Sequence, residues 1–306
     1  MVKMTLTLLA LLNMAILFPS RTMAQNSRSF PAESGREFNG EYQKEYLDRV
    51  AFPIGGIGAG MFCLEGTGAI SHVSLKNHPD VMNEPYAFAA IYVKGSGAKV
   101  LEGQVPTWKL FGPVQSGLGR GDKTYGLPRF EEAAFRARFP FATIDLKDKD
   151  LPLEVKIVGW SPFIPTDADN SSLPAGVLEY QFTNISDKNV ETIFSYNAKN
   201  FIDGQGNIQK VKNGFALKPA QDNDKNGLAV YVDNDKAVVD YCWFRGGWFD
   251  SQTVVWDNIR HGRIADNQPV KGVSPGASVY VPIELQPGET KTIQVNFCWY
   301  LPDSDL

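Results

Sequence analysis

Hydrophobic residues recur in short runs along most of the chain, and turn-forming residues separate one run from the next. Several runs alternate between apolar and polar positions, which is typical of a strand with one buried face. The clearest runs cover residues 141–146, 153–160, 176–182, 190–196, 228–232, 238–244, 279–285 and 290–300. This pattern predicts an all-β fold.

The last two runs make the most specific prediction. Val279, Val281 and Ile283 occupy every second position, and Gln-Pro-Gly-Glu follows at residues 286–289. Beyond that turn, apolar residues again occupy every second position in residues 293–297. Alternation on both sides of a Pro-Gly turn indicates a β-hairpin.

Helical patterns are few. Residues 128–139 could form a short helix with Phe130, Ala134 and Ala137 near one face, and residues 248–264 place apolar side chains at loosely helical spacing. Many short strands with one or two short surface helices predict a β-sandwich of antiparallel sheets.

The N-terminus has the features of a secretory signal peptide. Lys3 supplies a positive start, residues 4–18 are nearly all apolar, and Thr22-Met23-Ala24 offers small residues at the −3 and −1 positions of a cleavage site. The apolar run is too short to span a membrane comfortably, which argues against an anchor. We therefore expect residues 1–24 to be removed, residues 25–46 to form a polar N-terminal tail, and the chain to be exported to the periplasm or the outside.

Charge and cysteine content narrow the function further. The net charge is −4 over 306 residues without a basic block, so nucleic-acid binding through a positive surface is not expected. Cys63, Cys242 and Cys298 have apolar or aromatic neighbours, which favours small buried hydrophobes within strands. One disulfide would leave a third thiol over, and the sequence leaves open whether any two cysteines pair.

The glycine run GGIGAG at residues 55–60 invites comparison with a dinucleotide-binding loop. That fingerprint needs a third glycine at position 61, where this chain has Met61, and it must open a helix. The residues that follow instead predict a strand, and the lysine and hydroxyl residue of a P-loop are missing. We expect these glycines to build tight turns and close backbone approaches.

One polar segment nearly matches a calcium-binding loop. Asp222, Asp224 and Asn226 fall at ligand positions, Gly227 follows, and Asp233 replaces the usual glutamate at the twelfth position. The flanking residues predict strands rather than helices, and a polar hairpin tip often has this composition. Calcium at these four oxygen-bearing residues is the alternative, and no other cofactor is expected.

No catalytic residue can be assigned from motifs. A glycosidase needs two carboxyl groups that flank the scissile bond, and no motif selects such a pair. The acidic residues in loop-like positions are Glu65, Asp80, Glu84, Asp167 and Asp169. The histidines, which share no metal-ligand spacing, are His72, His78 and His261.

Several separated motifs nevertheless occur together in one order. They are FPIGGIGAG at 52–60, NHP at 77–79, WSPFIP at 160–165 and NSSLP at 170–174. Together they resemble the N-terminal domain of glycoside hydrolase family 116, the family of non-lysosomal glucosylceramidase and of bacterial β-glucosidases and β-xylosidases. The resemblance covers about residues 49–302 and implies a β-sandwich, in agreement with the strand pattern.

The resemblance also implies where the chemistry lies. Family members are retaining β-glycosidases whose glutamate nucleophile and aspartate acid/base belong to a C-terminal (α/α)6 barrel. No residue here matches either catalytic motif, so none is carried over. We expect residues 47–306 to form the sandwich domain and the barrel to be absent, and whether the chain is itself an enzyme stays open.

The expected function is therefore that of a noncatalytic sandwich in an exported β-glucosidase-like or glucosylceramidase-like glycosyl hydrolase. Its partner would be the helical-barrel catalytic domain, and a β-linked carbohydrate or glycolipid is a further candidate partner. Candidate contacts with the barrel are Asn83, Glu84, Trp248 and Trp256. The alternatives are a stand-alone carbohydrate-binding module and a small complete glycosidase.

The tryptophans bear on these alternatives because an exposed indole can stack on a sugar, whereas a buried one fills the core. Trp160 and Trp299 lie at the ends of predicted strands, so we expect them in the core. Trp248 and Trp256 are expected at a surface or an interface.

Overall fold

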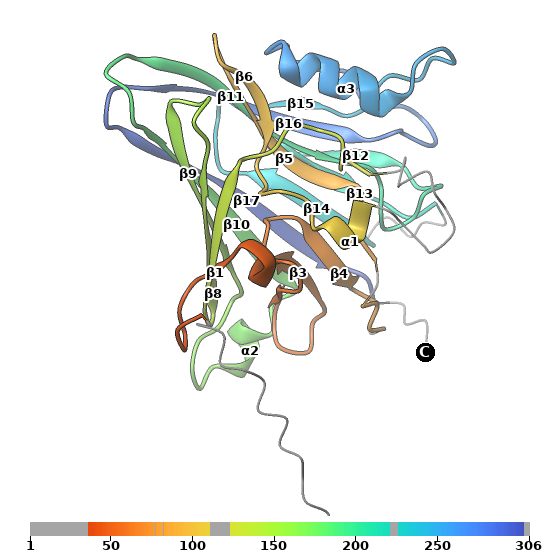
Figure 1. The fold of residues 1–306 in the computed structure, drawn as a ribbon. Helices are drawn as coiled ribbons and strands as arrows, with labels where there is room; N and C mark the ends of the chain where they lie inside the picture. The colour runs from red at the N-terminus through yellow and green to blue at the C-terminus, as the bar shows by residue number, and fades with distance from the viewer. Residues whose placement is uncertain (1–35, 77, 82, 111–122, 221–225, 303–306) are drawn as a thin grey trace, which may run out of the picture. The chain divides into compact units, whose positions relative to one another are not determined.

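The computed structural model describes residues 36–76, 78–81, 83–110, 123–220 and 226–302. Within these residues the chain forms three antiparallel sheets, two of which face each other as a β-sandwich (Figure 1). The all-β prediction is thereby confirmed.

The largest sheet has nine strands in the described part of the chain. Their order is β1 (Tyr42–Gln43), β7 (Glu132–Arg138), β8 (Phe141–Lys147), β9 (Leu153–Trp160), β10 (Ala175–Asn184), β17 (Thr290–Tyr300), β14 (Gly227–Val232), β13 (Gly214–Leu217) and β12 (Ile208–Val211). The five-stranded sheet has the order β15 (Val238–Asp240), β16 (Ala277–Leu285), β11 (Val190–Ala198), β5 (Ala87–Val93) and β6 (Gly97–Val100). A small third sheet consists of β2 (Ala51–Ile54), β3 (Met61–Glu65) and β4 (Ile70–Ser74).

The main core lies between the two large sheets. Along β9, alternation buries Leu153, Val155 and Ile157 and turns the residues between them outward, as the sequence pattern predicts. Aromatic contacts join the layers, because the rings of Tyr180 on β10 and Phe194 on β11 lie 5.1 Å apart. The third sheet adds its own apolar side chains to this core.

The helices of the described chain are short. They are the 3-10 turn η1 (Lys44–Leu47), α1 (Thr107–Leu110), α2 (Ala168–Ser171) and α3 (Ser251–Arg260). The predicted helix within residues 248–264 is confirmed as α3, which Asp250 caps by accepting a hydrogen bond from the Thr253 amide at 2.7 Å. Val255 and Ile259 bury one face of α3 against the outer side of the five-stranded sheet.

The predicted hairpin at residues 279–300 is wrong. β16 belongs to the five-stranded sheet and β17 to the nine-stranded sheet, so the Pro-Gly turn carries the chain from one layer to the other. The chain also passes from one layer to the other between β10 and β11. Asn184, at the end of β10, ties the two connections together, because its side-chain amide donates to the Leu285 carbonyl at 3.1 Å. Alternation shows only which face of a strand is buried, and both strands bury their apolar face in the same core.

The predicted helix at residues 128–139 is also wrong, because most of this segment is strand β7. Its Glu-Glu-Ala-Ala start favours a helix by intrinsic propensity, but β1 and β8 pair with β7 on either side and satisfy its backbone. Phe135 is fully buried and packs edge-on against Tyr42 of β1 at 6.0 Å. Tertiary pairing here overrides local preference.

The glycine run forms close backbone contacts, as expected. A Cβ atom at Gly56 would lie 2.1 Å from the Leu173 carbonyl oxygen, and Gly60 has a φ of +89°, which strains other residues. The Trp299 indole donates to the Ala59 carbonyl at 2.6 Å and anchors the run to β17. The run is therefore packed against the protein at Gly56, Ala59 and Gly60, whereas Ile57 and Gly58 are exposed.

The three cysteines are unpaired, which answers the question that the sequence left open. Cys63 and Cys242 are buried and Cys298 is partly exposed. Cys63 and Cys298 lie within strands, whereas Cys242 lies just after β15. The interpretation of these residues as small apolar side chains therefore fits best for Cys63.

The N-terminal predictions fall largely outside the described residues. The signal peptide at 1–24 and residues 25–35 of the predicted tail belong to that part of the chain. Within the predicted tail, Tyr42–Gln43 forms β1 and pairs with β7. Within the residues that the structure describes, none of the helices has the length and apolar character needed to cross a membrane.

Candidate functional site

A cleft of about 510 Å³ opens beside the end of β4. It contains two of the four predicted contact residues, Asn83 and Glu84, and Leu301 lies on its wall. Lys199 lines it as well and places its ammonium 4.9 Å from the ring centre of Tyr86. These features make the cleft the candidate site.

Asn83 fastens one wall of the cleft to β4. Its side-chain oxygen accepts from the Val73 amide at 2.8 Å, and its side-chain nitrogen donates to the Val73 carbonyl at 2.8 Å. The Asn83 carbonyl also accepts from the His72 amide at 2.9 Å. The Asn83 side chain thus bonds backbone groups of β4 in the way that a neighbouring strand would. These bonds fix the position of the adjacent Glu84.

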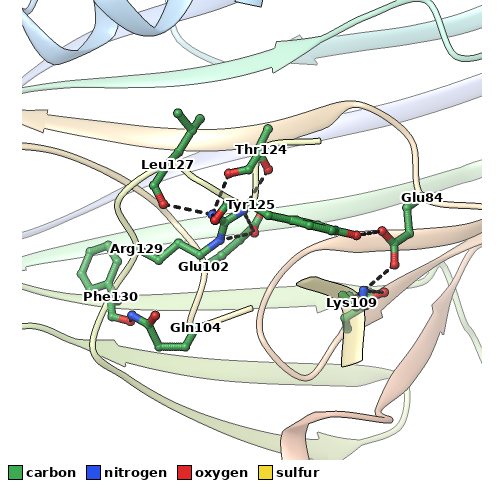
Figure 2. Close-up of polar contacts among 10 residues, drawn as sticks. Glu84, Glu102, Gln104, Lys109, Thr124, Tyr125, Leu127, Arg129 and Phe130 are labelled. Carbon is green, nitrogen blue, oxygen red and sulfur yellow. Dashed lines mark hydrogen bonds and ion pairs between the residues drawn. The ribbon is translucent and has the colours of Figure 1, made fainter. Parts of the chain in front are cut away.

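Glu84 belongs to a charged cluster beneath the cleft, which we call the ion cluster and define as Glu65, Glu84, Lys109 and Tyr125. The Lys109 ammonium lies 2.6 Å from carboxylate oxygens of both Glu84 and Glu65. Tyr125 donates its hydroxyl hydrogen to the other oxygen of Glu84. Figure 2 shows Glu84 between these two donors.

The cluster determines what its carboxylates can do chemically. Burial alone would raise the pKa of Glu84, but hydrogen bonds from Lys109 and Tyr125 outweigh burial and hold that pKa below its usual value. Burial likewise lowers the pKa of Lys109, and the two glutamates overcome this and raise it. Glu84 is therefore a carboxylate paired with a cation, which is the opposite of the protonated acid that a glycosidase uses to release its leaving group.

A buried arginine presents Tyr125 to the cluster. Arg129 pairs with Glu102 at 3.1 Å, and its guanidinium also donates to the carbonyls of Thr124 at 2.8 Å and Leu127 at 3.0 Å. These bonds hold residues 124–127 in one conformation over the sheet edge (Figure 2). The loop that carries Tyr125 is thus built around an internal ion pair.

A second hollow of about 480 Å³ continues the cleft toward α3. It shares Tyr86 and Lys123 with the cleft and is lined on its other side by Trp256 of α3. Asn83, Glu84 and Trp256 therefore border one continuous surface. Trp248 lines neither hollow and is 95% exposed just before α3.

The structure describes two of the four predicted calcium residues and places them far apart. Asn226 lies just before β14 and Asp233 just after it, so an extended strand separates them by about 20 Å. The Asn226 carbonyl accepts from the Lys218 ammonium at 2.6 Å. Asp222 and Asp224 lie outside the described residues, and no ion could contact both Asn226 and Asp233.

The remaining candidates are dispersed. Asp167 caps α2 by accepting from the Asn170 amide at 3.0 Å, which is a structural role. Across the described ranges, no three His, Cys, Asp or Glu side chains gather in a way that could hold a metal ion. Trp299 is buried as predicted, whereas Trp160 is only half-buried on the outer face of β9 because its strand position points away from the core.

Sequence reasoning missed Lys109, Tyr125 and Arg129. Lys109 lies 44 positions from Glu65 and 25 from Glu84, and no spacing rule links residues so far apart in a β fold. The one signal was indirect, since a lysine between apolar residues in Trp-Lys-Leu is a candidate for burial.

Comparison with known proteins gives a family match for most of the chain. The family described as beta-glucosidase 2, glycosyl-hydrolase family 116 N-term, matches residues 51–306. No curated protein matches the chain.

Solved structures resemble the chain weakly. One described as a kojibiose phosphorylase from the human microbiome has a TM-score of 0.36 at 9% identity, over 84% of this chain and 25% of that one. A polysaccharide lyase has a TM-score of 0.32 at 11% identity, over 81% of this chain and 32% of that one. The chain thus spans about a quarter to a third of the length of these structures.

The family match extends from β2 to the end of the sequence and includes the strands, the glycine run and the cleft residues described above. It agrees with the four motifs that the sequence carries. The chain belongs to glycosyl-hydrolase family 116, of which it represents the N-terminal domain.

Proposed function

We propose that this chain is the noncatalytic β-sandwich of an exported glycosyl hydrolase of the β-glucosidase or glucosylceramidase type. It packs on a helical-barrel catalytic domain through the cleft, the loop of residues 124–127 and α3. The family supports this proposal, because an N-terminal domain of a glycosyl hydrolase implies a catalytic partner domain.

The surface around the cleft carries the proposal. Glu84, Tyr86 and Leu301 line the cleft. The surface continues over Trp256 to α3, and Trp248 and Phe249 project there with 95% and 64% of their area exposed. Large exposed aromatic side chains of this kind are enriched at the centres of protein interfaces.

The ion cluster supports a noncatalytic role. Glu65 and Glu84 approach each other closely enough to suggest a carboxyl pair, but the Lys109 ammonium lies on both. Two carboxylates held on one ammonium in this way supply neither a free nucleophile nor a proton donor. Its role is to fix the cleft wall against which a partner packs.

Reconstitution tests the proposal. The purified chain and a separately produced family 116 catalytic domain should form a one-to-one complex in size-exclusion chromatography with light scattering. Trp248→Ala should weaken the complex about tenfold or more, since a buried interface tryptophan often contributes over 1.4 kcal/mol. Phe141→Ala, on the opposite face of the sandwich, serves as the control and should leave the complex unchanged.

An activity assay of the same samples separates the roles. The chain alone should not release the chromophore of an aryl β-glucoside, and the complex should. A chain that stays monodisperse and stable without binding the catalytic domain contradicts the packing proposal, and turnover by the chain alone contradicts the noncatalytic role.

Export is a separate part of the proposal, supported by Lys3, the apolar residues 4–18 and Thr22-Met23-Ala24. Expression in a bacterial host followed by fractionation should place the protein outside the cytoplasm. N-terminal sequencing should then give Gln25 as the first residue. A cytoplasmic protein that retains Lys3 would contradict export.

A further inference from the structure

The outer face of the nine-stranded sheet carries a row of side chains that the proposed function does not use. Register places Phe141, Trp160, Val177, Asn296 and Tyr231 side by side on five successive strands, β8, β9, β10, β17 and β14. We call these five residues the aromatic row. All of them are uncharged, and they point away from the core between the large sheets.

The two largest rings lean toward the middle of the row. The indole nitrogen of Trp160 donates to Glu179 on the neighbouring strand β10 at 3.0 Å. The hydroxyl of Tyr231 lies 4.0 Å from the sulfur of Cys298 on β17. A side chain that reaches across to the next strand lies over the sheet rather than standing upright, so each ring turns a face toward solvent.

Exposure agrees with this arrangement. Val177 and Asn296, in the middle of the row, are only 6% and 9% exposed although they face outward. Phe141 at one end is 47% exposed. The backbones of Trp160 and Tyr231 are three strand spacings apart, about 14 Å, and a short oligosaccharide can bridge that span.

The neighbouring positions leave room along the row. The next residues on the same face are small and partly exposed, namely Ala175, Cys298, Ala229 and Ala216. Tyr300 lies beyond them and is 55% exposed. On the other side, the amide of Gln294 donates to Asn296 at 2.8 Å and brings planar hydrogen-bonding groups next to the rings.

We propose that the aromatic row binds a neutral glycan chain that lies across the strands. The face of an aromatic ring is the negative side of its quadrupole and attracts the polarised C–H groups of a pyranose ring. Amide and carboxylate groups such as those of Gln294 and Glu179 can hydrogen-bond sugar hydroxyls. The five residues of the row are uncharged, and the acid Glu179 lies beside its middle. Arg138, which pairs with Phe141 at the end of the row, already donates to the carbonyls of Ala137 and Asn39. The middle of the row therefore favours a neutral glycan over an acidic one.

This site is distinct from the surface proposed for the catalytic domain. α3 covers the outer side of the five-stranded sheet, whereas the row lies on the outer side of the nine-stranded sheet, so the two surfaces are on opposite faces of the sandwich (Figure 1). A glycan and a catalytic domain can therefore bind together. The inference does not depend on the proposed packing.

Native affinity electrophoresis of the purified chain tests the inference. Gels that contain a soluble neutral mixed-linkage β-glucan should retard the protein, and gels with polygalacturonate should not. Trp160→Ala and Tyr231→Ala should each weaken the apparent affinity about tenfold, the loss of one ring–sugar contact of about 1.4 kcal/mol. Trp248→Ala, an equal change on the opposite face, is the matched control and should bind like the parent chain.

Each outcome decides the question once melting temperatures show that the variants are folded. Should Trp160→Ala fail to fold, Phe141→Ala removes a half-exposed ring at the end of the row and should weaken binding about threefold. The inference is overturned if neutral glucan does not retard the chain, if only the acidic polymer does, or if Trp248→Ala alone reduces binding. Loss of glycan binding in Trp160→Ala with an intact catalytic-domain complex keeps this result separate from the proposed function.

Discussion

Two carboxylates in this sandwich, the partly buried Glu84 and the buried Asp240, have opposite electrostatic surroundings. Glu84 shares the ammonium of Lys109 with Glu65 and accepts a hydrogen bond from Tyr125 (Figure 2). Asp240, at the end of β15, is 2% exposed and accepts from the Cys242 amide and the Asn267 side chain, both at 3.1 Å. One site therefore has a cation, and the other has neutral donors.

The difference appears in the two pKa values. Burial raises the pKa of Asp240 to about 6, with a smaller contribution from Asp266, and the two neutral hydrogen bonds only partly offset this. At Glu84 the bonds from Lys109 and Tyr125 overcome burial and lower the pKa. Hydrogen bonds to neutral donors satisfy a buried carboxyl group without fully compensating its charge.

The two sites therefore respond to pH in opposite directions. Asp240 binds its proton more tightly in the folded chain than in the unfolded one, so it lowers stability as the pH rises from about 4 to about 6. Glu84 binds its proton less tightly in the folded chain, so its contribution is present above the unfolded pKa and is lost as the pH falls through the folded pKa. Three substitutions test this contrast.

Removal of the shared cation should have the largest effect. Lys109→Met leaves Glu65 and Glu84 adjacent and uncompensated in a site where the lysine side chain is only 5% exposed. We expect urea unfolding at pH 7 to show a loss of about 3–5 kcal/mol in the free energy of unfolding, the usual result of breaking a buried ion pair from one side.

A matched variant separates charge from packing. Lys109→Met combined with Glu65→Gln and Glu84→Gln removes all three charges and should recover most of that loss. If Lys109→Met lowers the free energy of unfolding by less than about 1 kcal/mol, water solvates the two glutamates. The ion cluster would then not behave as a buried ion pair. If the triple variant is no better than the single one, packing of the lysine stem is the cause.

Neutralisation of Asp240 should have the opposite sign. Asp240→Asn keeps an oxygen that can accept from Cys242 and Asn267 but removes the charge. Because the folded pKa lies about two units above 3.8, the variant should gain at most about 3 kcal/mol at pH 8 and nothing at pH 3.5.

Thermal or urea unfolding between pH 3.5 and pH 8 measures this gain. The free energy of unfolding of the variant relative to the parent chain should rise between about pH 4 and pH 6 and then stay level. A variant that is destabilised equally at every pH would mean that the second carboxylate oxygen makes a bond that the amide cannot replace.

The sequence predicted the layers of this fold better than their connections. Alternation in residues 153–160 identified both the strand and its buried face, since Leu153, Val155 and Ile157 all face the core. The same alternation in residues 279–300 could not show whether the strands pair in one sheet or face each other across two. Pairing depends on partners distant in sequence, which a local pattern does not contain.

The candidate site shows the same limit. Glu84 and Trp256 were chosen from loop position and residue type, and the structure places both on one continuous surface. Lys109 and Arg129 were not foreseen, because their partners are brought together only by the packing of separate loops. Trp160 was expected in the core because it ends an apolar run, but strand parity turns it outward.

The smallest effect should come from Glu84→Gln. This change removes one of the two carboxylates on Lys109 and leaves Glu65 in place, so at pH 7 we expect a loss of about 1 kcal/mol, reduced by the partial exposure of Glu84. The loss should shrink as the pH falls below 4.5 and vanish once Glu84 of the parent chain is protonated. Glu191→Gln, which breaks an exposed pair with Lys94 at 2.9 Å, is the matched control and should change stability little at any pH. A pH-independent loss in Glu84→Gln would show that shape, rather than charge, determines the contribution of Glu84, and the contrast with Asp240 would then be lost.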